Sequence, residues 1–562
     1  MKRKNYLLWL SVIFILIAIN FIASFIHARI DLTNEKRFTI SEPVKELLKQ
    51  TKETVHVYLF LKGDLPAGFK MLSKSSQEVL QEFNDYSKGN IKFELIDPES
   101  KIESTQSTWA DTLQFYNILP INLKVQLKSG EQSQYVYPAA MAVKNGKMQP
   151  VHLYPGVRPV ITPAELNAAE SMFEFRFANA IQKLNSKSLP MVAYAIGNGE
   201  PTGANTYDLV ENVLHQNYSV FTIDLKSEVA IPDTFKVVLL VKPTLQFTEE
   251  EKLKIDQYVM RGGKLLVFID RLEAEMDSLQ IKNQVVAYDR DLNLQDLFFK
   301  YGVRINPDLI MDLQSDFLPF DVNNSGQYEL LHWNYFPLFQ GNQRSIITKN
   351  VGLISSRFVN SIDTVQATGI EKTVLISSSP NSRTIETPAL ISGSENRNAP
   401  EDEAFKKSGL IAGVLLEGKF KSLFKNRLSL EKMDTLAAQG YPFIPENILE
   451  NKMIIVSDGD IPLNSVYQGQ PLPMGVNPYT IGTQYEYQFA NRELVENCLE
   501  YLVNEGGLMQ AKSKDYKLRL LDSKKVDADK TFWQLINFVL PVVLILLFAL
   551  IYQYTRRKRY NI

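Results

Sequence analysis

Soft metal ligands and thiols are scarce in this chain of 562 residues. The one cysteine, Cys498, excludes an intramolecular disulfide and a zinc site built from several thiolates. The five histidines are too far apart in the sequence to form a local ligand pair such as HExxH: His27, His56, His152, His215 and His332. The sequence therefore predicts neither a metal site nor a disulfide framework.

Two signatures of enzymes are also missing. No stretch matches GxxxxGK[ST], the loop with which P-loop ATPases hold phosphate. No serine lies in the GxSxG elbow of a hydrolase. We therefore predict a chain without a catalytic site and without a cofactor.

Neither sign of charge is in excess. The chain has 61 Lys and Arg against 63 Asp and Glu, a net charge of −2, which argues against a protein that coats nucleic acid. A mean hydropathy of −0.14 excludes a polytopic transporter. The content of 45% hydrophobic and 22% charged residues is typical of folded domains, and about three to four of them fit this length.

Long uncharged runs occur only near the two ends, at residues 6–26 and 532–552. A helix of about 20 residues crosses the hydrocarbon core of a bilayer. Basic residues flank the first run at 2–4 and the second at 556–559, and basic flanks remain in the cytoplasm. We predict two membrane spans, with both termini in the cytoplasm and residues of about 27–531 on the far side of the membrane.

Two features of these runs allow different interpretations. The first run also resembles a cleaved signal peptide, but it is long for one and residues 24–28 form a poor cleavage site, which favours an uncleaved anchor. The amides of Asn20, Gln534 and Asn537 are costly in lipid and predict contacts with the helices of a partner. The alternative is that Gln534 and Asn537 lie near the interface and reach water.

Residues 31–188 alternate between strand and helix patterns. The patterns predict strands at 55–60, 91–96, 121–127, 134–143 and 149–153, with a hairpin turn at Asn145-Gly146, and helices at 71–86, 107–116 and 163–184. This order indicates an α/β domain of thioredoxin-like type. It lacks a CxxC motif and hence dithiol chemistry.

A second α/β domain is predicted at 189–521. Apolar strands at 192–196, 218–225, 237–241 and 264–269 alternate with helices at about 205–215 and after Thr248, where Thr248 and Glu251 form a capping box. Such alternation predicts a parallel sheet. Residues 272–408 lose the rhythm and are interpreted as an insertion, with a strand at 373–376 that belongs to the sheet. The remaining domains are residues 1–30, with the first span, and 522–562, with the second.

Two loops after strands are the candidate ligand site. Gly197, Asn198, Gly199 and Glu200 lie between a strand and a helix, where small residues let backbone N–H groups approach a ligand. The spacing is not GxGxxG and Glu200 adds negative charge, which disfavours a nucleotide, so a small-ligand or partner-contact loop and a simple tight turn remain.

The second loop, Asp458-Gly459-Asp460, also follows a strand. Two carboxylates could serve a metal, but no third ligand is evident and the same triplet is a common polar turn. Asp458 and Asp460 therefore join the candidate ligand site without a metal.

Several short motifs, taken in order with the two predicted anchors, resemble one family along almost the whole chain. They are residues 31–33, 36–41, 63–70, 83–87, 96–98, 197–201, 416–420 and 456–461. The chain resembles GldG, the gliding-motility-associated auxiliary component of an ABC transporter in Bacteroidetes-type bacteria. The resemblance implies a permease partner like GldF and, through it, a cytoplasmic ATPase like GldA.

The resemblance also implies that the second domain has the fold of class I glutamine amidotransferases. Their nucleophilic cysteine follows a strand, whereas Cys498 lies in a predicted helix, so amidotransferase activity is not expected. We predict a non-catalytic, doubly anchored subunit with an envelope ligand or partner. The alternatives are a tethered hydrolase of envelope polymers that uses Glu200 and Asp458, and a pure scaffold.

Overall fold

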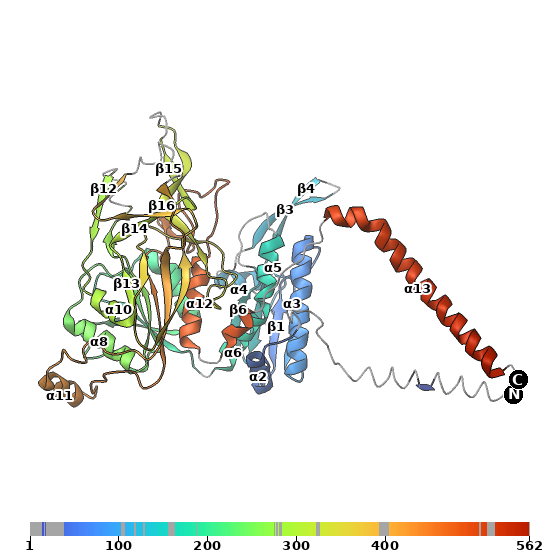
Figure 1. The fold of residues 1–562 in the computed structure, drawn as a ribbon, viewed down its shortest axis with the longest axis horizontal. Coiled ribbons are helices and arrows are strands. Elements are labelled where there is room, and N and C mark those ends of the chain that lie inside the picture. The colour runs from blue at the N-terminus through green and yellow to red at the C-terminus, as the bar shows by residue number, and fades with distance from the viewer. Residues whose placement is uncertain are drawn as a thin grey trace. The chain divides into compact units, whose positions relative to one another are not determined.

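Figure 1 shows the computed structural model of the chain. It describes Phe14, Ile15, Ile17 and residues 39–102, 107–116, 118, 120–127, 130–154, 163–186, 188–274, 276, 279, 284–321, 326–392, 404–504, 507–513 and 523–560. The chain divides into two units, residues 1–514 and 515–562, which are treated separately below. Asn20 and all but three residues of the expected first span lie outside the described residues.

The first sheet has four strands in the order β2-β1-β5-β6. Strand β1 (Val55–Leu59) is parallel to β2 (Ile91–Leu95) and antiparallel to β5 (Ala139–Lys144), which pairs with β6 (Lys147–His152). The β5–β6 hairpin turns at Asn145 and Gly146, both of which have positive φ, 50° and 78°. This is the turn that the Asn-Gly pair predicted.

Both faces of this sheet are covered. Val55, Val57 and Leu59 share one core with α2 (Glu42–Gln50), α3 (Ala67–Tyr86), α5 (Pro163–Ser171) and α6 (Phe173–Asn185). Alternate residues face the other way, where Phe60 packs with Trp109 of α4 (Trp109–Phe115). A separate hairpin joins β3 (Ile121–Leu127) and β4 (Gly130–Val136). We call the part built on this sheet the small lobe (residues 39–186).

Two elements expected in the small lobe are each divided in two. The strand expected at 134–143 is interrupted between β4 and β5, where Pro138 has no N–H for a ladder and its carbonyl accepts the N–H of Leu153 at 2.9 Å. The helix expected at 163–184 breaks at Met172, whose N–H bonds to the carbonyl of Ala169 in a tight turn.

The second sheet is mixed rather than parallel throughout. Its described part runs in the order β15-β16-β19-β22-β23-β10-β9-β7-β8. The expected parallel part consists of β8 (Ser219–Asp224), β7 (Met191–Ile196), β9 (Val237–Val241), β10 (Lys264–Phe268) and β23 (Asn451–Val456). An antiparallel part adds β22 (Ile411–Gly418), β19 (Ile370–Ser377), β16 (Glu329–Gly341) and β15 (Ser315–Phe320). The strand expected at 373–376 lies in β19.

Alternate residues of the parallel strands enter two different cores. Val237, Leu239 and Val241 of β9 pack toward α12 (Asn491–Val503), where Cys498 is also buried. Val238 and Leu240 pack toward α8 (Glu249–Met260) and α10 (Gln295–Tyr301). Figure 1 shows α12 on one side of the sheet and α8 and α10 on the other. Burial on both faces explains the uninterrupted apolar sequences of these strands.

The helix expected at about 205–215 is irregular. A 3₁₀ turn η1 (Ala204–Thr206) leads into a π-helix η2 (Asp208–Leu214) and a short α7 (His215–Asn217). The capping box of Thr248 and Glu251 at the start of α8 is present as predicted. We call the part built on the second sheet the large lobe (residues 188–504).

Smaller elements complete the large lobe. They are β11 (Leu272–Glu273), β12 (Gln284–Asp289), β13 (Val303–Ile305), β14 (Asp308–Asp312), β17 (Ile354–Ser355), β18 (Ile362–Thr364), β20 (Ser382–Glu386), β21 (Ala389–Ser392), α11 (Leu430–Ala438), β24 (Val466–Tyr467) and β25 (Gln470–Pro471). The 3₁₀ segment η5 (Leu508–Ser513) instead packs in the core of the small lobe, against α2 and α6.

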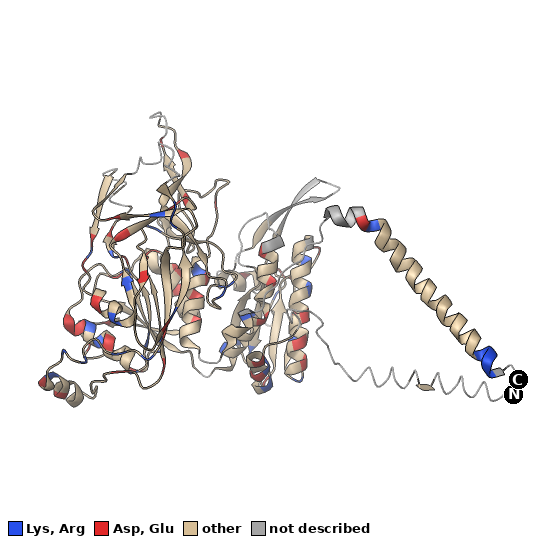
Figure 2. Ribbon diagram, viewed as in Figure 1, with Lys and Arg blue, Asp and Glu red and all other residues tan. Residues whose placement is uncertain are grey.

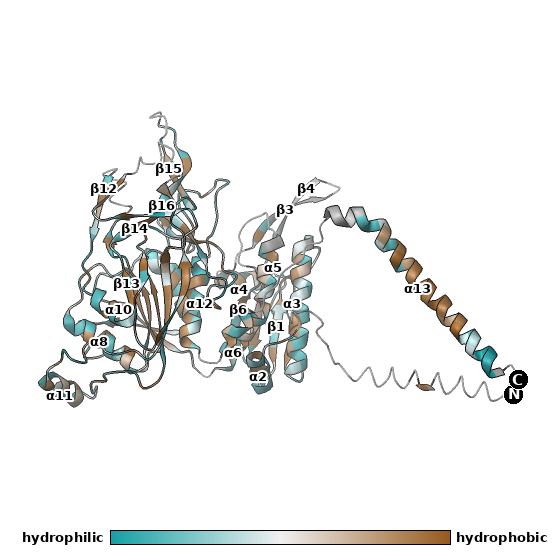
Figure 3. Ribbon diagram, in the orientation of Figure 1, coloured by the Kyte–Doolittle hydropathy of each residue, from teal (hydrophilic) through white to brown (hydrophobic). Residues whose placement is uncertain are grey.

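The second unit contains one long helix, α13 (Ser523–Tyr560). Its segment Asp529–Arg559 has 31 residues and contains an 18-residue window with a mean hydropathy of 2.8, so it is a candidate membrane span by length and composition. Figure 3 shows the apolar middle of α13, and Figure 2 shows basic residues at its C-terminal end. The span expected at 532–552 lies inside this segment.

Candidate functional site

The carboxyl ends of four parallel strands bring the two predicted loops to one edge of the large sheet. We call this the carboxyl edge. Gly197 follows β7, Lys242 follows β9, Asp270 follows β10, and Asp458 follows β23. Because β9 lies beside β7 in the sheet, the loop after β9 contacts the loop after β7, and the long side chain of Lys242 reaches past β10 to Asp460 in the loop after β23. Ligands of open α/β sheets bind at such edges.

Glycine is required in the loop after β7 for close packing. Gly197 and Gly199 have φ of +110° and +82°, conformations that L side chains rarely adopt. A methyl group on Gly199 would overlap Thr244 Oγ1. The backbone carbonyl of Asn198 accepts the N–H groups of Thr244 and Leu245, both at 2.8 Å. This loop is therefore a tight turn fixed on the loop after β9.

The acidic residue of this turn points inward. Glu200 is 8% exposed, and its Oε2 accepts the backbone N–H of Asn198 at 2.7 Å. Burial raises the pKa of Glu200. The Asn198 amide lies against Glu251, the capping residue of α8, at 3.4 Å. Among the described residues, Glu200 Oε1, Asn198 Oδ1 and Glu251 Oε1 are buried without a hydrogen-bond partner.

Asp458 is the most enclosed carboxyl group at the edge. It is fully buried and accepts the N–H groups of Arg357 at 2.9 Å and of Asp460 at 2.7 Å. Burial, and then the nearby charges of Asp460 and Asp270, hold the pKa of Asp458 well above its usual range. Asp458 thus fixes the turn after β23 and is not presented to solvent.

Lys242 is the charged partner of this loop, and the sequence analysis missed it. Its Nζ lies 2.8 Å from both carboxylate oxygens of Asp460 and 3.5 Å from Asp270 Oδ2. Its φ of +45° is unusual for a residue with a side chain. The N–H of Gly459 bonds to Asp270 Oδ1 at 2.6 Å. The available signal was a lysine directly after the wholly apolar strand β9.

The chemistry of this edge is that of a buried ion network. The ammonium of Lys242 pairs with the carboxylates of Asp270 and Asp460 and so occupies the position that a metal cation would need. Within the described residues, no group of three or more His, Cys, Asp and Glu side chains is placed to hold a metal ion. Ser457 donates to the carbonyls of Asn360 and Ala412, so its hydroxyl is not paired with a base.

The two carboxyl groups considered for a hydrolase are both bonded to backbone. Glu200 accepts the N–H of Asn198 in its own loop, and Asp458 accepts the N–H groups of Arg357 and Asp460.

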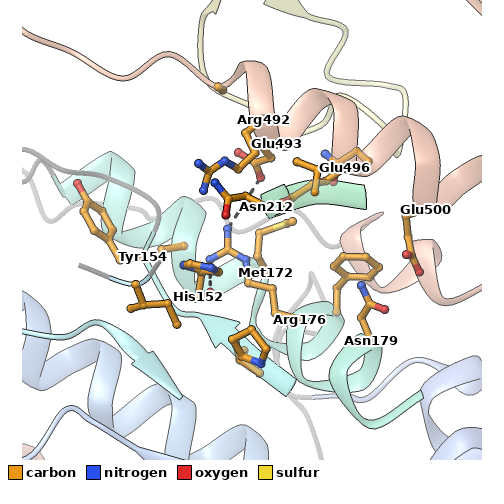
Figure 4. Close-up of a pocket in the computed structure, with 18 of the residues that line it drawn as sticks. His152, Tyr154, Met172, Arg176, Asn179, Asn212, Arg492, Glu493, Glu496 and Glu500 are labelled. Atoms are coloured by element: carbon orange, nitrogen blue, oxygen red, sulfur yellow. Dashed lines mark hydrogen bonds and ion pairs between the residues drawn. The ribbon is translucent and has the colours of Figure 1, made fainter. Parts of the chain in front are cut away.

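A cavity lies between the two lobes, and none of the predicted site residues lines it. This interlobe cavity has a volume of about 400 Å³. Figure 4 shows Arg176 of α6 directed at Glu493 of α12, an ion pair of 3.9 Å, while Arg176 also donates to the carbonyl of His152 at 2.9 Å. Desolvation by the surrounding protein, and to a smaller extent the positive charges of Arg492 and Arg176, lower the pKa of His152 to about 4. Arg492 pairs with Asp208 of η2.

The amides predicted to meet partner helices lie on α13. Gln534 and Asn537 are exposed on this helix and, three residues apart, share one side of it. Asn20 lies outside the described residues.

The sequence was compared with models of known protein families. The model of a family described as "ABC-type uncharacterized transport system" matches residues 189–498, more than half of the chain. The chain belongs to this ABC-type transport-system family. Membership supports a transporter-associated subunit, and the matched segment contains both loops of the carboxyl edge.

Three further similarities were found. A domain of unknown function (DUF7088) matches residues 34–143. An uncharacterized protein of Borreliella burgdorferi is 22% identical over 581 residues, covering 100% of both chains. The solved structure of the mmIFT52 N-terminal domain matches 56% of this chain and 97% of its own, with 12% identity and a TM-score of 0.31.

Proposed function

We propose that this chain is a non-catalytic, membrane-anchored auxiliary subunit of an ABC transporter complex. The observation that carries the proposal is the family match over residues 189–498. The apolar helix α13 supports it, because an auxiliary subunit needs a place in or at the membrane. The missing phosphate loop agrees with ATP hydrolysis by another chain.

The proposed topology is that of a bacterial inner-membrane protein with two spans. Both termini are cytoplasmic, and residues of about 27–531 are periplasmic. The basic residues at 556–559, at the end of α13, support the cytoplasmic placement of the C-terminus (Figure 2).

The proposed domains are a thioredoxin-like domain at 31–188 and an amidotransferase-like domain at 189–521 with an insertion at 272–408. The strand order β2-β1-β5-β6, with β1 and β2 parallel and β5 antiparallel to β1, supports the first. The parallel strands β8-β7-β9-β10-β23 support the second.

The proposed partners are a GldF-like permease and, through it, a GldA-like ATPase of a gliding-motility system. The exposed amides of Gln534 and Asn537 are the proposed contacts with permease helices, and Asn20 has the same proposed role in the first span. Amides hydrogen-bond across helices in lipid.

The carboxyl edge of the large sheet is the proposed meeting place with an envelope ligand or partner. Glu200 and Asp458 are buried and bonded to backbone, so their proposed role is to position the loops that make the contact. Asp460, whose side chain is 20% exposed, is the more exposed partner of the nearly buried Lys242.

The test is a crosslinking pull-down from native membranes with a C-terminal tag, read by mass spectrometry. We expect a permease and an ATPase among the captured proteins. A variant in which residues 532–552 are replaced by an unrelated apolar span is the control, because it keeps the anchor and removes Gln534 and Asn537. Capture of envelope polymer alone, or equal capture by the control, would overturn the proposal.

A further inference from the structure

A second cavity has a composition unlike that of the interlobe cavity. It lies beside the carboxyl end of β10, next to the network around Lys242, and has a volume of about 510 Å³. Small-molecule sites typically measure about 300–1,000 Å³. Its walls come from the segment after β10, from α10 and the residues before it, from β13, and from the loop after β22. We call it the α10 pocket.

The interior of the α10 pocket is apolar. Its lining includes Leu292, Leu294, Phe298, Ile305 and Leu423, each between 2% and 8% exposed. Phe299, which also lines the pocket, is 56% exposed. Apolar walls with an exposed aromatic ring favour a ligand that brings hydrocarbon.

The polar part of the lining is strongly cationic. Arg271, Arg290, Lys300, Arg304 and Arg427 line the pocket together with one carboxylate, Asp296, so positive charges exceed negative ones by four. Within this set Arg427 pairs with Asp296 at 2.9 Å. Arg271 pairs with Asp289, outside the lining, at 2.8 Å. Lys300 and Arg304, both exposed, add further positive charge to this lining, although the whole chain carries a net charge of −2.

An apolar interior with a cationic lining is complementary to one class of molecule. We propose that the α10 pocket binds a single-chain amphiphile with an anionic head group. The hydrocarbon chain would lie against the apolar walls, and a carboxylate or phosphate head would meet the guanidinium groups, whose fork geometry matches such oxyanions. Occupancy of this pocket does not depend on the proposed contact with a permease.

The experiment uses the full chain in native membranes and a dodecanoate probe with a photoreactive diazirine in its chain. Labelled peptides are mapped by mass spectrometry. We expect label in residues 292–305 and 423–427, removed by excess unlabelled dodecanoate and retained with dodecyltrimethylammonium, which has the same chain and the opposite charge. Label confined to α13, or equal competition by the cationic amphiphile, would overturn the proposal.

Competitors without hydrocarbon test the apolar part of the argument. Acetate and inorganic phosphate should leave the label in place, and removal of the label by either alone would contradict the requirement for a chain. Dodecyl phosphate competing as well as dodecanoate would support recognition of an oxyanion head. Binding only to vesicles of phosphatidylglycerol would indicate a bilayer surface instead and would overturn the proposal.

Matched variants locate the determinants. Arg304→Glu reverses one charge on an exposed side chain of β13 and should reduce labelling about tenfold. Arg344→Glu, an exposed arginine outside the pocket, should leave labelling unchanged. Phe299→Ser should reduce labelling as well, and Phe115→Ser, on the 83% exposed phenylalanine of α4, is its control. Equal labelling of each variant and its control would overturn the proposal.

Discussion

At the scale of single residues, the carboxyl edge depends on one lysine. Lys242 has an unusual positive φ and directs its ammonium to Asp460 and Asp270. Both Lys242 and Asp270 are nearly buried, at 8% and 5% exposure. Removal of one partner from a buried pair leaves a charge without compensation, which costs more than the pair contributes when intact.

Lys242→Met should therefore destabilise the fold by about 3 kcal/mol. The measurement is urea unfolding of the detergent-solubilised chain, followed by fluorescence. Lys236→Met is the matched control, because Lys236 precedes the same strand β9 and is exposed. A loss of stability that is equal in the two variants would contradict the role assigned to Lys242.

At the scale of elements, the loops after the strands are held by close backbone approach. Gly199 packs on Thr244, and a methyl group on Gly459 would come within 2.6 Å of Lys242 Cγ. Two different reasons for glycine can be separated in this chain. Gly199 has positive φ and no room for a methyl group, whereas Gly262, after α8, has a φ of +95° and no atom within 4 Å of an added methyl.

We predict that Gly262→Ala costs about 1 kcal/mol, the strain of a left-handed backbone alone. Gly199→Ala should cost a further amount of about 1–3 kcal/mol, because the added methyl group must also displace Thr244. The free energies of unfolding of the two variants give the comparison. Equal losses of unfolding free energy would mean that the loop after β7 accommodates the added methyl group at no extra cost.

At the scale of the whole molecule, the two lobes meet around a charged hollow. Arg176 of the small lobe pairs with Glu493 of the large lobe, and Lys183 donates to Asn217 at 2.7 Å. The side chain of His152 lines the interlobe cavity. Desolvation by the surrounding protein disfavours its protonated form, and the positive charges of Arg492 and Arg176 do so to a smaller extent (Figure 4).

This environment predicts a pH dependence with a definite sign. His152 has a folded-state pKa of about 4, against 6.5 for the free side chain. Below pH 6.5 the unfolded chain binds a proton that the folded chain does not bind until about pH 4, so stability falls as pH decreases through this window. In His152→Gln, melting temperatures measured across the same window should fall less than those of the natural chain. Parallel curves would contradict the prediction.

The proposed membrane partner gives a separate prediction. Gln534→Leu combined with Asn537→Leu should keep the chain in the membrane and reduce co-purified permease roughly tenfold, since interhelical amide bonds contribute about 0.6–1.7 kcal/mol each. Thr555→Ala is the control, because the Thr555 hydroxyl bonds to the carbonyl of Ile551 in its own helix. Undiminished capture of the permease by the double variant would show that these amides do not contribute to the contact.

The features that were predicted correctly from the sequence are local. The Asn145-Gly146 hairpin, the capping box of Thr248 and Glu251, and the strand β9 each depend on residues close together in the chain. Errors arose where distant residues decide the backbone. The helix after Gly203 was expected to be regular, yet η2 is a π-helix in which Asp208 bonds to Met474 and Arg492, more than 250 residues away.

The features of the candidate site can likewise be separated into those set by the local sequence and those set by the tertiary structure. The sequence by itself determined the apolar parallel strands, the glycines after β7 and the long apolar helix α13, because periodicity, backbone freedom and span length are properties of short segments. Only the tertiary structure decided that Lys242 closes the network of Asp460 and Asp270, and that five cations surround one apolar pocket. Lys242 and Asp460 are 218 residues apart, and the sheet order that joins them is set by packing of the whole domain.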